Sequence, residues 1–234
     1  MLTDSSKAIG SDGHAEPRPP RGLFLAFLST DLLLLYLPVF VPCLRIPGTH
    51  WNWSGKVMSI TFCCLVLACS PWLRQNVGLR WHQSKGSLLF SLICLFAFLG
   101  DSIMLGFNEG PVSFPLETLL FQVFVPSIDE ELVFRGIGLA LLERAYGQSP
   151  MSCRFRYGMA AFSTSLAFGL VHGIQGLNHG GVTFLYFPFL VTFVTGSLFA
   201  LIRTRSGSLL WPMLCHTAIN VPMFLVSIMR YGLL

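Results

Sequence analysis

The sequence has few charged residues for its length. Lysine, arginine, aspartate and glutamate make up 11% of the 234 residues, whereas about 25% is typical of a soluble domain. Hydrophobic residues make up 53%, and they are grouped in long apolar segments separated by short polar ones. This composition excludes an ordinary soluble domain. It predicts an all-α, polytopic membrane protein, because a helix satisfies its own backbone hydrogen bonds within a bilayer.

Several familiar kinds of site are missing from the sequence. The seven cysteines are an odd number, most of them lie in or beside apolar segments, and no two have the Cys-x-x-Cys spacing of a metal site. There is no His-Glu-x-x-His motif, which excludes the helical zinc-protease arrangement. The net charge of +4 is modest, and no basic patch is interleaved with aromatic residues. We therefore expect no disulfide framework and no nucleic-acid partner.

The chain divides into a polar amino-terminal segment and one membrane domain. Residues 1–21 contain several prolines and glycines and little apolar surface, so we expect a disordered cytoplasmic tail. Residues 22–234 are expected to form a transmembrane bundle of about seven to eight helices. Its apolar segments predict spans at residues 22–44, 57–72, 87–107, 116–142, 157–172, 182–202 and 208–229. Pro126 should kink or restart the fourth helix, placing Asp129 near a helix start, where its charge suits the dipole.

The distribution of lysine and arginine predicts the orientation in the membrane. With seven spans, 11 of these residues fall on the side of the amino terminus, and only Arg45, Lys56 and Arg230 fall on the other side. Cytoplasmic segments carry the excess of positive charge in membrane proteins. We therefore expect a multi-pass integral membrane protein with a cytoplasmic amino terminus, in the plasma (inner) membrane if the organism is bacterial.

A charged cluster lies in the fourth apolar segment. Within seven residues it contains Asp129, Glu130, Glu131 and Arg135. A charge near the centre of a bilayer costs from roughly 2.5 to more than 10 kcal/mol, so such a cluster needs a structural or functional reason. On a helix, Glu131 and Arg135 stand at i and i+4 and can pair, whereas Glu130 is rotated by about 100°. The cluster is either a structural salt bridge between packed spans or part of a functional site.

Two later segments contain polar residues with helical spacing. Phe168 and His172 share one face of the fifth span, and His216 and Asn220 share one face of the seventh. Either histidine alone is typical of a structural hydrogen-bonding residue. Together with the acidic cluster, however, three helices offer polar groups, and polar groups inside a membrane turn toward one another or toward water.

The residue types allow two kinds of chemistry. A carboxylate and an imidazole can bind and deprotonate a water molecule, while a second imidazole and a carboxamide can donate hydrogen bonds to an oxyanion. These are the parts needed for peptide hydrolysis. Alternatively, Glu130, His172 and His216 could be three zinc ligands with water as the fourth. The residues alone leave both possibilities open.

Three short motifs summarise these residues. In chain order they are Glu130-Glu131-x-x-x-Arg135, Phe168-x-x-x-His172 and His216-x-x-x-Asn220. This ordered trio resembles the motifs of the CPBP family of intramembrane glutamic endopeptidases, which includes the type II CAAX prenyl proteases and the bacteriocin-processing enzymes. The resemblance covers residues 114–229 and implies a helical bundle that encloses a polar active-site cavity.

The resemblance also implies a role for each motif residue. Glu130 would activate the water with His172 as its partner, and His216 and Asn220 would form the oxyanion site. The supporting residues would be Glu131, Arg135 and Phe168. Catalysis would use no cofactor, with zinc as the alternative.

These observations predict an intramembrane endopeptidase that uses a glutamate-activated water. Its partners would be the lipid bilayer and a peptide or membrane-tethered protein substrate. Two other functions are compatible with the sequence. One is a non-catalytic membrane scaffold or bacteriocin-immunity protein of the same fold. The other is a proton-coupled transporter that uses Asp31, Asp101 and Glu130 as a relay.

Overall fold

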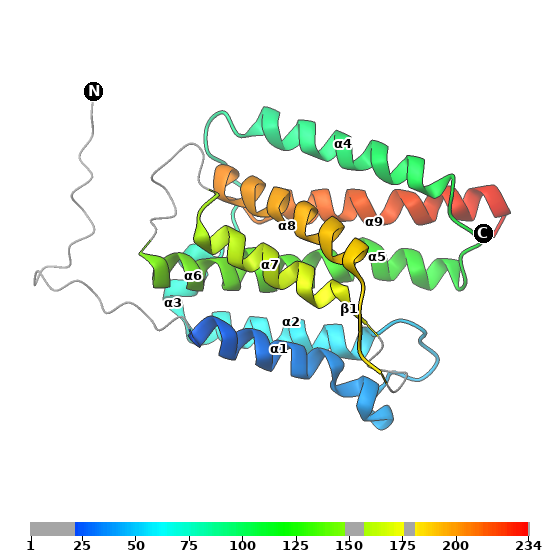
Figure 1. The fold of residues 1–234 in the computed structure, drawn as a ribbon, viewed down its shortest axis with the longest axis horizontal. Coiled ribbons are helices and arrows are strands. Elements are labelled where there is room, and N and C mark those ends of the chain that lie inside the picture. The colour runs from blue at the N-terminus through cyan, green and yellow to red at the C-terminus, as the bar shows by residue number, and fades with distance from the viewer. Residues whose placement is uncertain (1–21, 148–156, 176–180, 234) are drawn as a thin grey trace, which may run out of the picture.

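A computed structural model describes residues 22–147, 157–175 and 181–233 as a helical bundle (Figure 1). The tail expected at residues 1–21 lies outside the described residues. The helices are α1 (Gly22–Phe40), α2 (Trp53–Cys69), α3 (Pro71–Asn76), α4 (Leu88–Gly106), α5 (Pro115–Glu131), α6 (Leu139–Tyr146), α7 (Met159–Gly173), α8 (Tyr186–Ser206) and α9 (Leu210–Tyr231). A short 3-10 helix, η1 (Pro42–Leu44), follows α1, and a π-helix, η2 (Leu132–Gly138), joins α5 to α6. Strands β1 (Ile174–Gln175) and β2 (Thr183–Phe184) pair antiparallel between α7 and α8. The all-α prediction is confirmed.

The bundle has the features of a membrane protein. Helices α1, α4, α8 and α9 are long and apolar enough to cross a bilayer, and α2 and α7 are shorter apolar helices. Large apolar side chains such as Leu33, Phe96 and Phe187 are more than 60% exposed on the outside of the bundle. An apolar surface of this extent suits contact with lipid rather than with water. The expectation that the chain is a membrane protein is therefore supported by both helix length and surface.

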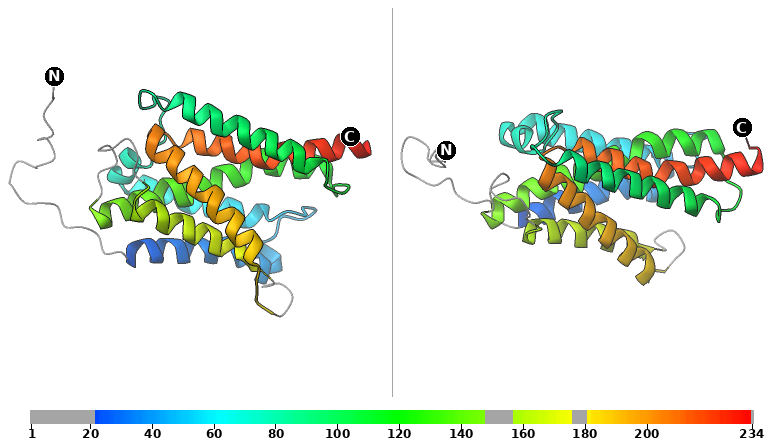
Figure 2. Two further views of the ribbon diagram at one scale, coloured as in Figure 1. Left: turned by 45° about the horizontal axis from the view of Figure 1, so that its top comes forward. Right: turned by 90° about the horizontal axis from the view of Figure 1, so that it is seen from above.

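The helices pack side by side in a defined order. Helix α4 packs along α9 at one edge of the bundle, and α1 packs along α2 at the opposite edge (Figures 1 and 2). Helix α5 packs against α9 and also against α2, so it connects the two edges. The acidic motif at the end of α5 is therefore in the interior of the bundle, within reach of helices from both sides.

The start of the second helix differs from the prediction. Helix α2 begins at Trp53 rather than at residue 57, and the Asn52 side chain caps it by accepting a hydrogen bond from Gly55 N at 3.1 Å. This earlier start places Lys56 inside the helix, where only 8% of it is exposed. The prediction that Lys56 lies just before the second span was therefore wrong. A lysine can lie in this position because carboxylates face it, as described below.

The predicted restart of the helix at Pro126 is also absent. Helix α5 continues through Pro126 to Glu131, and Asp129 lies in its last turn with 2% exposed. The predicted helix-start role of Asp129 was therefore wrong. Thr217 of α9 donates to the carbonyl oxygen of Val123, one turn before the proline, at 3.4 Å. This bond ties α5 to α9 one turn before the proline, whereas the carbonyl group that Pro126 leaves without its helical donor is that of Gln122.

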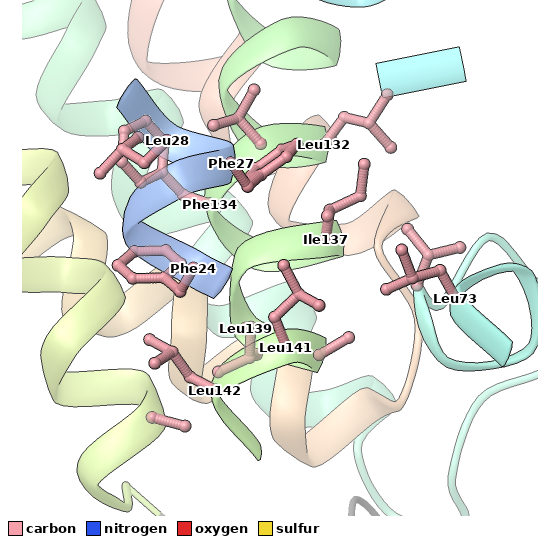
Figure 3. Close-up of a cluster of buried hydrophobic side chains, with 14 of the residues drawn as sticks. Phe24, Phe27, Leu28, Leu73, Leu132, Phe134, Ile137, Leu139, Leu141 and Leu142 are labelled. Atoms are coloured by element: carbon pink, nitrogen blue, oxygen red, sulfur yellow. The ribbon is translucent and has the colours of Figure 1, made fainter. Parts of the chain in front are cut away.

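The irregularity of this helix comes after the acidic motif instead. All seven residues of η2 are buried, and four of them, Leu132, Val133, Phe134 and Ile137, belong to the larger apolar core. Figure 3 shows α1 side chains against η2 and α6, with Leu73 of α3 nearby. The labelled side chains are Phe24, Phe27, Leu28, Leu73, Leu132, Phe134, Ile137, Leu139, Leu141 and Leu142. Widened helical turns of this type occur frequently at functional sites, and here dense packing fixes the helix directly after the two glutamates.

Candidate active site

Three helices bring the predicted polar residues to one place. Glu130 is near the end of α5, His172 is near the end of α7, and His216 is in the second turn of α9. The Oε2 atom of Glu130 lies 3.6 Å from Nε2 of His172 and 3.7 Å from Nε2 of His216. These separations are too long for direct hydrogen bonds. A water molecule in the cavity beside these atoms could contact both the carboxylate and an imidazole.

The orientation of His172 is fixed by its own helix. Its Nδ1 atom lies 2.9 Å from the carbonyl oxygen of Phe168, and a carbonyl oxygen can only accept. The Nδ1 atom therefore carries the hydrogen, and in the neutral ring Nε2 is an acceptor that faces Glu130. The Phe168 ring lies 4.4 Å from the imidazole, centroid to centroid. The i, i+4 spacing of Phe168 and His172 thus sets both the tautomer and the packing of the histidine.

The orientation of His216 depends on another helix. Its Nδ1 atom lies 2.9 Å from Oε1 of Glu131, and its ring stacks on Phe199 with centroids 5.4 Å apart. The same Glu131 oxygen accepts from Nη1 of Arg135 at 2.9 Å. Both Glu131 and Arg135 are fully buried. Glu131 therefore anchors an imidazole and a guanidinium, whereas Glu130 faces the cavity.

Arg135 lies in an aromatic pocket that the sequence analysis did not define. Its guanidinium carbon lies 4.1 Å from the centroid of Phe168 and 5.3 Å from that of Phe199. Within the described residues, its Nε and Nη2 atoms have no hydrogen-bond partner. Cation–π contacts to two rings therefore complement the Glu131 ion pair. Gly196 of α8 provides the space, since a Cβ atom there would lie 2.7 Å from Nη2 of Arg135.

This close approach predicts the effect of a single methyl group. Gly196→Ala should destabilise the protein by about 1–3 kcal/mol, because the methyl group would displace the Arg135 guanidinium or the Phe168 ring. The measurement is thermal unfolding of the purified protein in detergent. Gly100→Ala in α4 is the matched control, since a Cβ atom at Gly100 meets nothing within 4 Å. Equal melting temperatures for both variants would contradict the prediction.

Asn220 faces the same cavity but makes a different contact. Its Nδ2 atom donates to Oε1 of Gln122 on α5 at 3.1 Å. This bond uses one of the two amide hydrogens and leaves the other for a further acceptor. Gln122 was not among the predicted residues. Its only sequence signal is its place in an apolar helix two turns before Glu130, on the same face.

A cavity of about 480 Å³ opens beside these groups. Its polar wall contains Asn52, Lys56, Gln122, Glu130, His172, His216 and Asn220, together with two threonines of α8. Its apolar wall includes Trp51, Phe121, Phe199, Ile219, Met223 and Phe224. A second cavity of about 210 Å³ lies on the side of α1 and α2, and it shares Asn52, Lys56, Glu130 and His172 with the first. Glu130 therefore stands at the boundary of two cavities.

Two other acidic residues of the sequence analysis are found in different surroundings. Asp31 of α1 is 2% exposed and lines the smaller cavity. Asp101 of α4 is exposed on the outside of the bundle. The arrangement does not place Asp101 with Asp31 and Glu130, as a proton relay through the bundle would require.

The arrangement does not fit the zinc alternative. Within the described residues, no group of three histidine, cysteine, aspartate or glutamate side chains is placed to hold a metal ion. The ammonium group of Lys56 already lies 2.8 Å from Oε1 of Glu130. A zinc ion bound to Glu130 would place a second cation against a carboxylate that already contacts an ammonium group. We therefore derive no step that involves a metal.

A comparison with protein families finds a match over the segment that contains the motifs. Residues 112–222 match the family described as type II CAAX prenyl endopeptidase Rce1-like. The matched segment contains all three motifs and the helices that hold Glu130, His172, His216 and Asn220. No curated protein and no solved structure matches the chain. Residues 112–222, which carry all three motifs, therefore form a segment similar to the Rce1-like type II CAAX prenyl endopeptidases, a family of CAAX-type proteases.

Proposed function

We propose that this protein hydrolyses a peptide bond of a membrane-associated protein or peptide with a water molecule activated by Glu130, without a cofactor. The observation that carries the proposal is the convergence of one carboxylate oxygen with two imidazole nitrogens, at 3.6 and 3.7 Å, beside a cavity of about 480 Å³. The family match supports peptidase activity in general. The roles of individual residues below are part of the proposal.

The water would lie in the larger cavity, beside both Glu130 and His172. It would donate one hydrogen to Oε2 of Glu130 and the other to Nε2 of His172, which is an acceptor because Nδ1 donates to the Phe168 carbonyl oxygen. Glu130 would take the proton as the water oxygen attacks the carbonyl carbon. It would then return the proton to the leaving amine, so that the carboxylate is regenerated.

His216 and Asn220 would stabilise the oxyanion formed in this step. Nε2 of His216 would donate to the oxyanion when both ring nitrogens carry a hydrogen, with Nδ1 bound to the carboxylate of Glu131. The second amide hydrogen of Asn220 would complete the pair of donors, since the first is bound to Gln122. Donors fixed before the reaction stabilise developing charge without having to reorganise, which is a large part of many catalytic rate enhancements.

The wall of the larger cavity indicates the substrate class. Aromatic and aliphatic side chains form most of the wall away from Glu130. An apolar wall around a few polar groups suits a peptide with apolar side chains next to the bond that is cut. We infer a substrate whose cleaved segment is apolar and held at the membrane by a lipid group or a span.

The test is cleavage by the purified protein in lipid vesicles. Lipid-tethered peptides with apolar residues near the carboxyl terminus should be hydrolysed, and H₂¹⁸O should place one ¹⁸O atom in the new carboxyl terminus. The rate should be unchanged by a chelator such as 1,10-phenanthroline, because no step requires a metal. Product mass spectrometry measures both outcomes.

Two results would contradict the proposal in different ways. Loss of cleavage with the chelator and its recovery with zinc would replace the metal-independent mechanism with a zinc-dependent one. Failure of the folded protein to cleave any peptide of the tethered set would contradict endopeptidase activity itself. A chelator analogue that cannot bind metal, 1,7-phenanthroline, is the control for effects on the vesicles.

A further inference from the structure

We propose that Lys56 is a positioning residue for Glu130, and that its ammonium group holds Oε1 so that Oε2 faces the two imidazoles. This inference rests on the proposed function. Lys56 belongs to α2, outside the residues 112–222 that match the protease family. The amino-terminal half of the chain would therefore supply a part of the active site that none of the three motifs contains.

The contacts of Lys56 are short and buried. Its Nζ atom lies 2.8 Å from Oε1 of Glu130 and 2.7 Å from Oδ2 of Asp129. Only 11% of its side chain is exposed, compared with 16% for Glu130 and 2% for Asp129. One cation thus bridges two carboxylates that are adjacent in the sequence. Charge-assisted hydrogen bonds of this length in a buried site are stronger than those between neutral groups.

The two oxygens of Glu130 have separate surroundings. Oε1 contacts Lys56, whereas Oε2 is the atom nearest to His172 and His216. A glutamate side chain has three rotatable bonds, so an unrestrained carboxylate would point in several directions. The Lys56 contact removes this freedom at one oxygen and so fixes the other. Because Lys56 and Glu130 line both cavities, the contact fixes Oε2 at their boundary.

A second set of polar groups holds Lys56 in turn. Ser59 lies one helical turn after Lys56, and its hydroxyl contacts Oδ1 of Asp129 and, at 2.7 Å, Oδ1 of Asp31. A hydroxyl has one hydrogen, so it donates to one of these carboxyl groups at a time. Ser59, Asp129 and Asp31 are each at most 2% exposed. Helices α1, α2 and α5 are therefore connected by a polar chain that ends at Glu130.

The main competing role for Lys56 is to balance the buried charge of Asp129. In that case Lys56 would matter for folding and not for the reaction. The two roles make different predictions for a protein that lacks both charges. Removing one partner of a buried pair destabilises a protein, whereas removing both is often neutral. A double variant can therefore fold normally and still lack the group that positions Glu130.

The experiment compares Lys56→Met with Lys56→Met/Asp129→Asn in the vesicle cleavage assay. The single variant should give less folded protein, and the double variant should recover it. We expect kcat of the double variant to remain about 100-fold below that of the wild type, because small misplacements of a reacting group have effects of this size. KM should change by less than about threefold, since Lys56 is not proposed to bind the peptide. Lys56→Arg should recover part of kcat, because it restores a cation.

The matched control is Lys85→Met, which removes an exposed lysine and should leave kcat unchanged. Wild-type kcat in a well-folded Lys56→Met/Asp129→Asn variant would overturn the positioning role while the proposed function stands. A rise in KM of about 100-fold with unchanged kcat would also overturn the positioning role, because Lys56 would then act in binding the peptide. A wild-type protein without cleavage activity would instead overturn the proposed function, and this inference with it.

Discussion

Glu130→Gln is expected to lower the rate of peptide cleavage by about 10²- to 10⁴-fold, the range that a general base contributes. A carboxamide cannot take the proton from the attacking water. The carboxamide has nearly the same size as the carboxylate of Glu130. Its oxygen can still accept a hydrogen bond from Lys56, as Oε1 of Glu130 does at 2.8 Å. The variant should therefore fold like the wild type. Initial cleavage rates in vesicles, together with thermal unfolding, measure both properties.

A glutamate-to-glutamine substitution at an exposed position is the control for replacing a carboxylate with a carboxamide. Glu109 lies in the connection between α4 and α5 and is exposed, so Glu109→Gln should cleave at the wild-type rate. If Glu130→Gln were folded and cleaved as fast as Glu109→Gln, Glu130 could not be the base. A small residual rate in Glu130→Gln would still agree with the mechanism, because the oxyanion donors and the bound peptide remain.

The sequence predicted contacts within a single helix better than contacts between helices. Glu131 and Arg135 form the pair expected from their i, i+4 spacing, because a helix fixes the distance between such positions. The contact of His216 with Glu131 joins positions 85 residues apart, and its existence depends on how α5 and α9 pack. A periodic pattern contains no information on such packing. The ordered motifs could indicate that these residues meet, but not which atoms face one another.

The buried position of Lys56 could not be predicted by counting positive residues. A lysine next to an apolar run is normally a residue of the membrane interface, and the count of positive residues treated it so. The structure places it opposite Asp129 and Glu130 instead. Two carboxylates remained without a partner in the predicted cluster, and this excess of negative charge was the available signal. Asn52 was a second signal, because asparagine is a typical helix cap and its position before Trp53 indicates that α2 begins there.

The course of the helix around the acidic motif was mispredicted for a related reason. Proline has a strong local preference against helix interiors, and this preference suggested a kink or a restart of the helix at Pro126. Packing against α9 overrides that preference, and α5 remains continuous. The π-helix from Leu132 to Gly138 has no comparable signal in the sequence. The π-helix follows Glu131 and contains Arg135. Both charged side chains are buried there, together with the apolar residues between and after them.

Arg135→Met is expected to have the largest effect on stability, about 3–5 kcal/mol, the typical result of removing one partner of a buried ion pair. Glu131 is fully buried and would lose the guanidinium that lies 2.9 Å from its Oε1 atom. The cation over the Phe168 ring would also be lost. The measurement is unfolding of the purified protein in mixed detergent micelles, with the free energy extrapolated to the absence of denaturing detergent.

A second variant separates stability from catalysis at the same position. Glu131→Gln/Arg135→Met removes both charges, so most of the lost stability should return. Cleavage should not return, because His216 would then lack the carboxylate that binds its Nδ1 atom. If Arg135→Met were as stable as the wild type, the buried pair would not hold the motif together. If the double variant cleaved normally, Glu131 would be structural only, and the oxyanion site would have to be formed by groups other than an imidazolium at position 216.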